Sequence, residues 1–131
     1  MEEIKFRAWD KINGKTRPIV SIDFLNKTVN LLNEYTNEIY ARDFVDIKIM
    51  QYTGLNDEES NEIYNGYIIE GGYLNPLLNE FISKKYIVVY DAGSFTGKLI
   101  GHSPYGDTWL HFIKGKVIGN IYENPELLEV R

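Results

Sequence analysis

Short runs of alternating apolar and polar residues are the feature that most restricts the fold of this chain. Apolar residues occupy every second position from 4 to 8, from 20 to 24 and from 45 to 49. Such alternation predicts half-buried strands, because successive side chains of a strand point to opposite faces of the sheet. Asn13-Gly14 and Asn26-Lys27 separate the first runs and are typical of tight turns. The first third of the chain therefore predicts an antiparallel meander.

The middle and the end of the chain carry helix signals. Asn75 followed by Pro76 suits a helix N-cap and first turn, so residues 75–82 predict a short helix. Asn124-Pro125-Glu126 predicts another at the C-terminus, where the acid complements the helix dipole. Residues 33–44 fit either irregular structure or a single short helix, because Thr and Asn are weak helix formers.

The second half of the chain otherwise continues the strand pattern. Residues 86–90 are apolar at both parities, so we expect this strand to be covered on both faces, by the core and by another element or subunit. Residues 109–113 and 117–122 predict a last hairpin around Gly115. The predicted fold is mainly β: an antiparallel meander or partly open barrel with short helices in the middle and at the C-terminus.

Length and composition predict one domain over residues 1–131, with an N-terminal meander over 1–55 and a C-terminal β portion over 62–131. The absence of cysteine excludes disulfides and thiolate metal sites and suits a reducing cytoplasm. No apolar run approaches the ~20 residues of a membrane helix, and no signal-peptide core follows the acidic N-terminus. We therefore expect a soluble, cytoplasmic protein.

The charge argues against polymeric nucleic acid as a partner. The formal net charge is −5 and the basic residues are scattered, with Lys84-Lys85 the only adjacent pair. Proteins that bind duplex nucleic acid normally cluster basic residues to neutralise phosphates. A small nucleotide remains compatible with this composition, because a pocket needs only one or two cations.

Several motifs that suggest chemistry lack the required spacing. Residues 93–98 resemble a phosphate-binding loop but have three residues instead of four between the glycines, and Leu follows the Lys. His102 and His111 are the only histidines; Asp107 or Asp91 could complete a metal site with them, but nothing in the sequence fixes the geometry. Ser103 and Asp107 lie near His102 but on one turn-rich loop, without a nucleophile elbow. We therefore expect no enzymatic activity, no cofactor and no metal.

Three segments of the sequence resemble the YopX family, which is encoded mostly by phages and prophages of Gram-positive bacteria. The segments are Lys5–Asp10 (KFRAWD), the pair Ile49–Leu55 (IMQYTGL) and Glu62–Ile69 (EIYNGYII), and Val117–Leu127 (VIGNIYENPEL). The chain departs from the family at Tyr67, where relatives usually have Asp after Gly. The resemblance implies a phage setting in the cytoplasm of a bacterial host, but no particular reaction.

The candidate binding residues are polar and aromatic side chains that the core pattern does not require. In the predicted site, an aromatic ring stacks on a flat ligand, Arg7 meets an anionic group, and Gln51 and Thr53 supply hydrogen bonds. The alternative interpretation is structural, with Trp9 capping a barrel end and Tyr52 bonding near the Gly54 turn. The complete candidate set is Arg7, Trp9, Gln51, Tyr52, Thr53, Trp109 and His111.

These observations leave three hypotheses for the function. The first is a non-catalytic phage protein that sequesters a small host molecule, such as a nucleotide-derived defence signal. The second is a protein-interaction module that inhibits a host enzyme, with residues 73–82 as a contact and the acidic surface imitating nucleic acid. The third, a DNA-associated accessory factor, fits the charge least well. Under the first two we expect a homo-oligomer.

Overall fold

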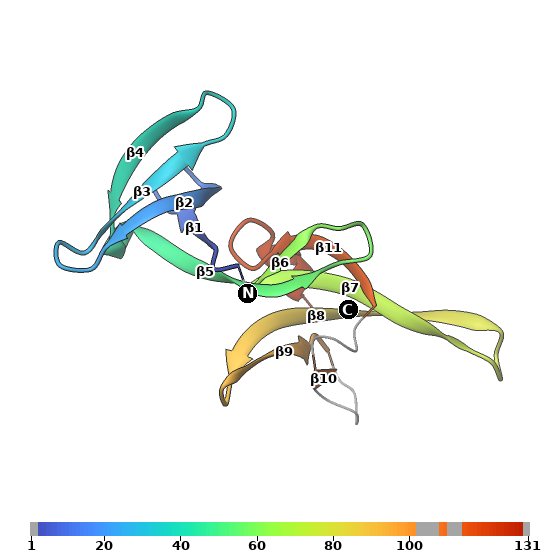
Figure 1. The fold of residues 1–131 in the computed structure, drawn as a ribbon. Helices are drawn as coiled ribbons and strands as arrows, with labels where there is room; N and C mark the ends of the chain where they lie inside the picture. The colour runs from blue at the N-terminus through green and yellow to red at the C-terminus, as the bar shows by residue number, and fades with distance from the viewer. Residues whose placement is uncertain (1–2, 102–107, 110–113, 130–131) are drawn as a thin grey trace. The chain divides into compact units, whose positions relative to one another are not determined.

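The structure is a computed structural model that describes residues 3–101, 108–109 and 114–129. The chain divides into two compact units, Met1–Tyr52 and Thr53–Arg131 (Figure 1). Both are built from antiparallel strands, and the only helices among the described residues are two 3-10 turns, Phe44–Asp46 and Pro125–Leu128. The mainly β fold class predicted from the alternation is therefore confirmed.

The first unit is a meander in which each strand pairs with a neighbour in sequence, except that β5 returns beside β1. The order is β4-β3-β2-β1-β5, and β5 continues past the unit boundary to pair with β6. Its core contains Ala8, Val29, Leu31 and Ile47, against which Ile19 and Tyr40 pack. The strands are β1 (Phe6–Asp10), β2 (Lys15–Asp23), β3 (Thr28–Asn33), β4 (Glu38–Asp43) and β5 (Ile47–Asn56).

Short polar turns connect these strands. Asn37 adopts a φ of 64°, a left-handed conformation that Asn tolerates better than most residues, and its backbone nitrogen donates to the Asn33 carbonyl at 2.7 Å. This turn directs residues 38–43 back along β3, with Leu31 opposite Tyr40. The segment for which we expected irregular structure or a short helix is thus a turn over residues 34–37 followed by the strand β4.

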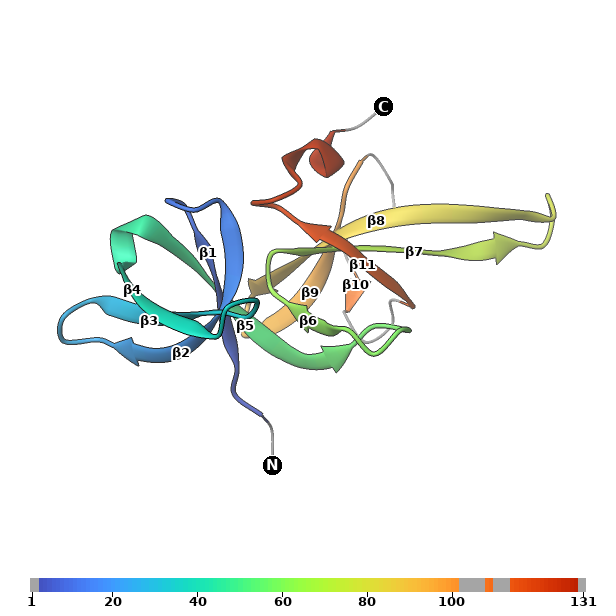
Figure 2. The same ribbon diagram turned by 90° about the horizontal axis from the view of Figure 1, so that it is seen from above.

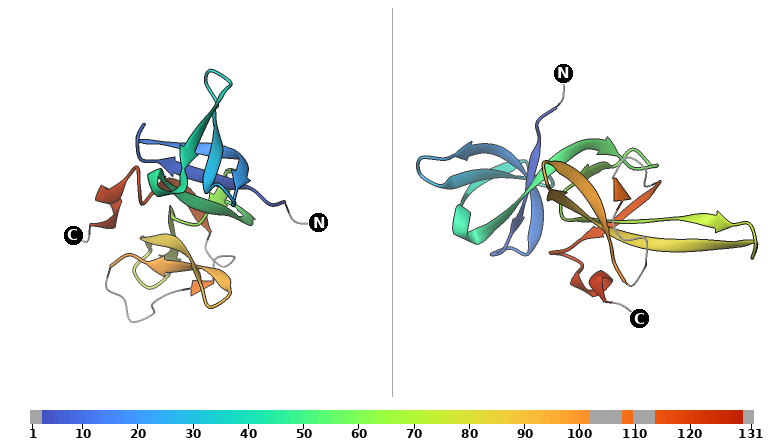
Figure 3. Two further views of the ribbon diagram at one scale, coloured as in Figure 1. Left: turned by 90° about the vertical axis from the view of Figure 1, so that its left-hand side faces the viewer. Right: turned by 90° about the horizontal axis from the view of Figure 1, so that it is seen from below.

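The second unit is a five-stranded sheet in the order β10-β9-β8-β7-β11, with β6 beside β5. Ile63, Ile69 and Val88 form its buried core, with Tyr67, Phe95 and Val117 packed against them. Figure 3 gives two further views of this sheet. Its strands are β6 (Glu62–Tyr64), β7 (Tyr67–Asn75), β8 (Glu80–Asp91), β9 (Ser94–Leu99), β10 (Thr108–Trp109) and β11 (Gly115–Asn120).

The hairpin of β7 and β8 is longer than the strands on either side of it. β11 pairs with β7 only as far as Gly71, and β9 pairs with β8 only from Tyr86 onward. Residues 72–83, here called the arm, therefore pair only with each other within the described part of the chain. Figure 2 shows the two strands of the arm continuing together beyond the rest of the sheet.

The arm replaces the helix predicted for residues 75–82. The Asn75 side chain accepts a hydrogen bond from the Leu77 backbone nitrogen at 3.0 Å, and Asn79 has a φ of 51°. Asn-Pro therefore opens a turn here.

The last hairpin, predicted for residues 109–113 and 117–122, is not formed by the described residues. Trp109 pairs with Thr96 of β9, whereas β11 pairs with β7.

The apolar run at residues 86–90 is buried in the core only in part. Val88 is fully buried, but the side chain of Tyr90 is 62% exposed and its ring packs edge-on against Phe95 at 5.1 Å. The excess of apolar residues in this strand is thus partly taken up by the core and partly by an aromatic pair at its end.

Candidate functional site

Two of the predicted site residues, Arg7 and Trp9, lie on the same face of β1 and are half-buried. The Arg7 Nη2 donates to the Thr16 carbonyl oxygen and to the Glu34 Oε1, both at 3.4 Å. The guanidinium thus already contacts a carboxylate from the turn between β3 and β4. Both distances are long for hydrogen bonds of a charged group. An anionic ligand could therefore replace Glu34 as the partner of Arg7 at small cost.

The pairing of β1 with β5 separates the next two candidates. Gln51 lies opposite Phe6 and Met50 lies opposite Arg7, which puts Gln51 on the sheet face away from Arg7. Tyr52 shares the parity of Met50, and the Lys5 ammonium lies 5.7 Å from its ring centroid. Arg7, Trp9 and Tyr52 therefore share one face of the β1–β5 pair.

The remaining three candidates belong to the second unit. The Thr53 hydroxyl donates to the Ile63 carbonyl at 2.8 Å and accepts from the Leu55 nitrogen at 3.2 Å, so it stabilises the approach of β5 to β6. The backbone of Trp109 belongs to β10, and its side chain lies outside the described atoms. His111 lies outside the described residues altogether. The role of the seven residues as a ligand site stays a prediction.

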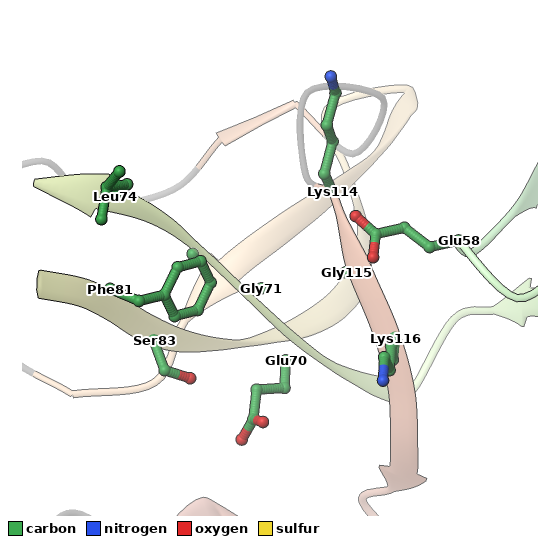
Figure 4. A pocket seen from close by; sticks show the side chains of 10 residues that line it. Glu58, Glu70, Gly71, Leu74, Phe81, Ser83, Lys114, Gly115 and Lys116 are labelled. Atoms are coloured by element: carbon green, nitrogen blue, oxygen red, sulfur yellow. The ribbon is translucent and has the colours of Figure 1, made fainter.

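The structure contains a different concave site, at the base of the arm. We call this hollow the arm hollow; its volume is about 560 Å³, within the range of small-molecule sites. Figure 4 shows its side chains, which come from β7, β8, β11 and the loop between β5 and β6. None of the seven predicted residues lines it. The lining residues are Glu58, Glu70, Gly71, Gly72, Leu74, Phe81, Ser83, Lys114, Gly115 and Lys116.

An apolar wall and a glycine floor shape this hollow. Leu74 and Phe81 are cross-strand partners, 57% and 66% exposed. A Cβ at Gly72 would collide with the Ile82 carbonyl oxygen, and the Phe81 Cζ would lie only 3.0 Å away. At Gly115 a Cβ would collide with the Glu70 carbonyl oxygen. Glycine is therefore required at both positions for the strands to pair this closely.

Charged side chains of both signs surround the apolar wall. Lys114 and Lys116 flank Gly115, while Glu58 and Glu70 stand on neighbouring segments. The Lys116 ammonium lies 3.2 Å from the Glu59 carboxylate, in a pair exposed on both sides. Such exposed pairs contribute little to stability, so the lysine is available for another anion at small cost.

Asp57 holds the acidic loop against β11 and so positions Glu58. Its carboxylate accepts hydrogen bonds from the backbone nitrogens of Val117 at 2.9 Å, Asn61 at 2.8 Å and Glu59 at 2.9 Å. The Glu58 nitrogen donates to the Gly115 carbonyl at 3.1 Å. Burial alone would raise the pKa of Asp57, but these hydrogen bonds hold its pKa below the ordinary value of 3.8.

A second carboxylate cluster lies in the first unit. Asp10 is fully buried and accepts from the Tyr40 hydroxyl at 2.9 Å and from the Arg42 Nε at 3.1 Å. The Ile12 nitrogen also donates to it, at 3.0 Å. Burial alone would raise the pKa of Asp10, but the hydrogen bonds from Tyr40, Arg42 and the backbone lower it below 3.8. The full set of partners identifies this cluster as structural.

The residues of the arm hollow were missed because their local sequence predicted something else. Asn75-Pro76 favoured a helix, and a helix prediction excludes the cross-strand pairing of Leu74 with Phe81 that the structure shows. The available signal was the concentration of apolar residues around an Asn-Pro turn, which is unusual for a solvent-exposed turn.

Two classes of site are not found in the described part of the chain. Residues 3–101, 108–109 and 114–129 contain no group of three His, Cys, Asp or Glu side chains placed to hold a metal ion. No helix among them is long and apolar enough to cross a membrane.

One protein family matches the chain along most of its length. The model of the family described as YopX protein matches residues 5–129. A crystal structure of protein EF1440 from Enterococcus faecalis is similar, with a TM-score of 0.64 and 25% identity over 98% of this chain and 100% of that one. The crystal structure of protein yopX from Bacillus subtilis has a TM-score of 0.63 and 22% identity over 100% and 99%. No curated protein sequence matches the chain.

Proposed function

Because the chain belongs to the YopX family, we propose that it is a non-catalytic phage or prophage accessory protein that sequesters a small host molecule in the host cytoplasm. The observation that supports a binding role is the arm hollow, which combines an exposed aromatic ring, a glycine floor and two lysines in about 560 Å³. These are the parts that a flat, anionic ligand requires.

The hollow offers a separate contact for each part of a nucleotide-like ligand. The ring of Phe81 supplies a stacking surface beside Gly72. Lys114 and Lys116 would meet a phosphate, and the carboxylates of Glu58 and Glu70 would accept N–H donors of a base. A ligand without either the flat ring or the anionic group would lose one of these contacts.

Thermal unfolding against a panel of nucleotides and cyclic nucleotides tests this proposal. A ligand at a hundredfold excess over its dissociation constant adds about 2.7 kcal/mol to the free energy of unfolding. The shift should disappear in Phe81→Ala and in the double variant Lys114→Gln/Lys116→Gln. Lys98→Gln, which removes an exposed charge from β9 outside the hollow, should keep it.

The outcome that contradicts a ligand at the arm hollow is equally direct. If no nucleotide shifts the unfolding temperature, and mass spectrometry of protein purified from infected cells finds no bound small molecule, the sequestration hypothesis is wrong. If a ligand binds and the hollow variants retain it, the ligand occupies another site, for which the face shared by Arg7, Trp9 and Tyr52 is the first to test.

The arm supports a second candidate function, association with a second copy of the chain. Its tip exposes Leu74, Leu77, Leu78 and Phe81, whose exposed fractions range from 57% to 92%. Contiguous exposed apolar residues mark interaction surfaces, and an isolated two-stranded hairpin is marginally stable in water. Both considerations favour a partner along the arm.

Charge along β8 favours another copy as that partner. Glu80 lies near the tip of the arm, and Lys84 follows directly after its last residue on β8. If two β8 edges pair antiparallel about a two-fold axis at Ile82, each Glu80 lies opposite a Lys84 of the other copy, on the same face of the sheet. A single strand edge can thus be complementary to itself.

Analytical ultracentrifugation with charge reversal tests this pairing. Glu80→Lys and Lys84→Glu should each weaken self-association, and the double variant should restore it, while Lys98→Glu should have no effect. A wild-type protein that is monomeric at all concentrations would rule the pairing out. If such a monomer instead retains one host enzyme stoichiometrically at low salt and releases it at high salt, the inhibitor hypothesis gains support.

A further inference from the structure

Arg17, in the first unit, is a buried arginine that pairs with no carboxylate among the described residues. Its side chain projects from β2 on the same face as Ala8, its partner on β1, and only 9% of the residue is exposed. In the described part of the chain Arg17 has no ion pair, and its Nε is buried without a hydrogen-bond partner. A guanidinium N–H that is buried without an acceptor costs free energy, which a hydrogen-bonding anion would recover.

The nearby acids already have other partners. Asp10 accepts from the Tyr40 hydroxyl and the Arg42 Nε. Glu34, in the turn between β3 and β4, lies 3.4 Å from the Arg7 guanidinium. These two acids are thus directed toward other cations, and in the described part of the chain neither pairs with Arg17.

The contact that Arg17 does make is with an aromatic ring at the surface. The guanidinium carbon lies 5.6 Å from the centroid of Tyr35, a residue that is 91% exposed. The turn that carries Tyr35 is ordered, because the Asn33 Oδ1 accepts from the Tyr35 nitrogen at 3.0 Å. An aromatic ring is therefore exposed to solvent while the arginine beside it is buried. Hydrophobicity alone would favour the opposite arrangement.

We propose that Arg17 and Tyr35 form a binding site for a small anion attached to a flat ring. The guanidinium pairs with a carboxylate or a phosphate through charge-assisted hydrogen bonds, and the ring of the ligand stacks on Tyr35. This site belongs entirely to the first unit and shares no residue with the arm hollow, so neither site depends on the other.

Nuclear magnetic resonance titration of the wild-type chain tests the site without any mutation. The Nε–Hε signal of Arg17 should move saturably with benzoate or phenyl phosphate and less with acetate or inorganic phosphate, since the last two have no ring to stack. Comparing the two ring-bearing anions identifies whether a carboxylate or a phosphate is preferred. If none of the four anions moves this signal, the proposal is wrong.

Variants then separate the two contacts. Arg17→Gln should weaken binding of both ring-bearing anions by about tenfold or more, the change that about 1.4 kcal/mol produces. Tyr35→Ala should abolish the preference for anions with a ring but retain the response to inorganic phosphate. Lys15→Gln removes an exposed charge two residues from Arg17 on the same strand and should leave binding unchanged.

One further variant guards against a loss of folding in Arg17→Gln. Arg17→Lys keeps the charge but removes the planar pair of donors, so it should bind weakly while its circular dichroism matches the wild type. Unchanged affinity in both Arg17 variants would overturn the proposal, and so would an equal loss of affinity in Lys15→Gln.

Discussion

Asp57, in the loop after β5, accepts a hydrogen bond at 2.9 Å from the backbone nitrogen of Val117 on β11, 60 residues later in the chain. The same carboxylate accepts from the nitrogens of Glu59 and Asn61. One side chain therefore closes the acidic loop on itself and fastens it to the edge of the sheet. The loop joins the paired strands β5 and β6, and its residues 58–61 are exposed.

Replacing Asp57 with Ala should lower the free energy of unfolding by about 1.5–3 kcal/mol, because several hydrogen bonds to a charged group are lost at once. Urea denaturation followed by circular dichroism measures this change. The control is Glu59→Gln, which breaks only the exposed pair with Lys116 and should cost less than about 1 kcal/mol. Equal effects of the two substitutions would mean that the bond to Val117 does not stabilise the fold.

Stability should fall in acid because the pKa values of Asp10 and Asp57 are both lowered in the folded state. A carboxyl with a lowered pKa stabilises the fold fully above its ordinary value of 3.8, and the contribution is lost as the pH falls through the folded pKa. Unfolding temperatures measured from pH 7 to pH 2 should therefore drop below about pH 4. Asp57→Asn should show a shallower drop than the wild type, and a parallel curve would contradict this.

Asp10→Asn should destabilise the first unit by about 3 kcal/mol, since it leaves the Arg42 guanidinium beside a neutral group in a buried site. Tyr40→Phe removes one hydrogen bond to the same carboxylate and should cost about 1 kcal/mol. Asp43→Asn, at an exposed position on β4, is the matched control. Denaturant midpoints rank the three, and the ranking Asp10, Tyr40, Asp43 is the expected result.

Val88→Lys should prevent folding of the second unit, because Val88 is fully buried with Ile63 and Ile69 and a lysine there has no partner. Leu77→Lys, at a residue that is 92% exposed on the arm, should fold normally. The dispersion of amide signals in a nuclear magnetic resonance spectrum distinguishes a folded variant from an unfolded one. A folded Val88→Lys protein would show that the core of this sheet is not where the structure puts it.

Local pattern was sufficient for the strands of the first unit but not for every turn. Alternation around Ala8 and a turn at Asn13-Gly14 predicted β1 and β2, because both signals are contained in a few neighbouring residues. The strand β4 was missed, since its stability comes from pairing with β3, as between Leu31 and Tyr40. Weak local propensity was overridden there by a neighbouring strand.

The candidate sites were harder to predict because their residues meet only through pairing between distant segments. Leu74 and Phe81 become neighbours when the arm forms, and Asn75-Pro76 is compatible with a helix start as well as a turn. The sequence predicted an anion contact for Arg7, but the register puts Arg17 on the core face, where no carboxylate of the described residues pairs with it. Which arginine is buried depends on that register, and no local motif encodes it.

The independence of the arm from β9 and β11 affects how the family can diversify. Because residues 72–83 pair only with one another in the described chain, a matched pair of residues can be inserted or deleted on both sides of the turn, and the register nearer the core stays the same. The reach of the hairpin, and any contact made at its end, can then evolve without a compensating change in the residues that pack around Val88.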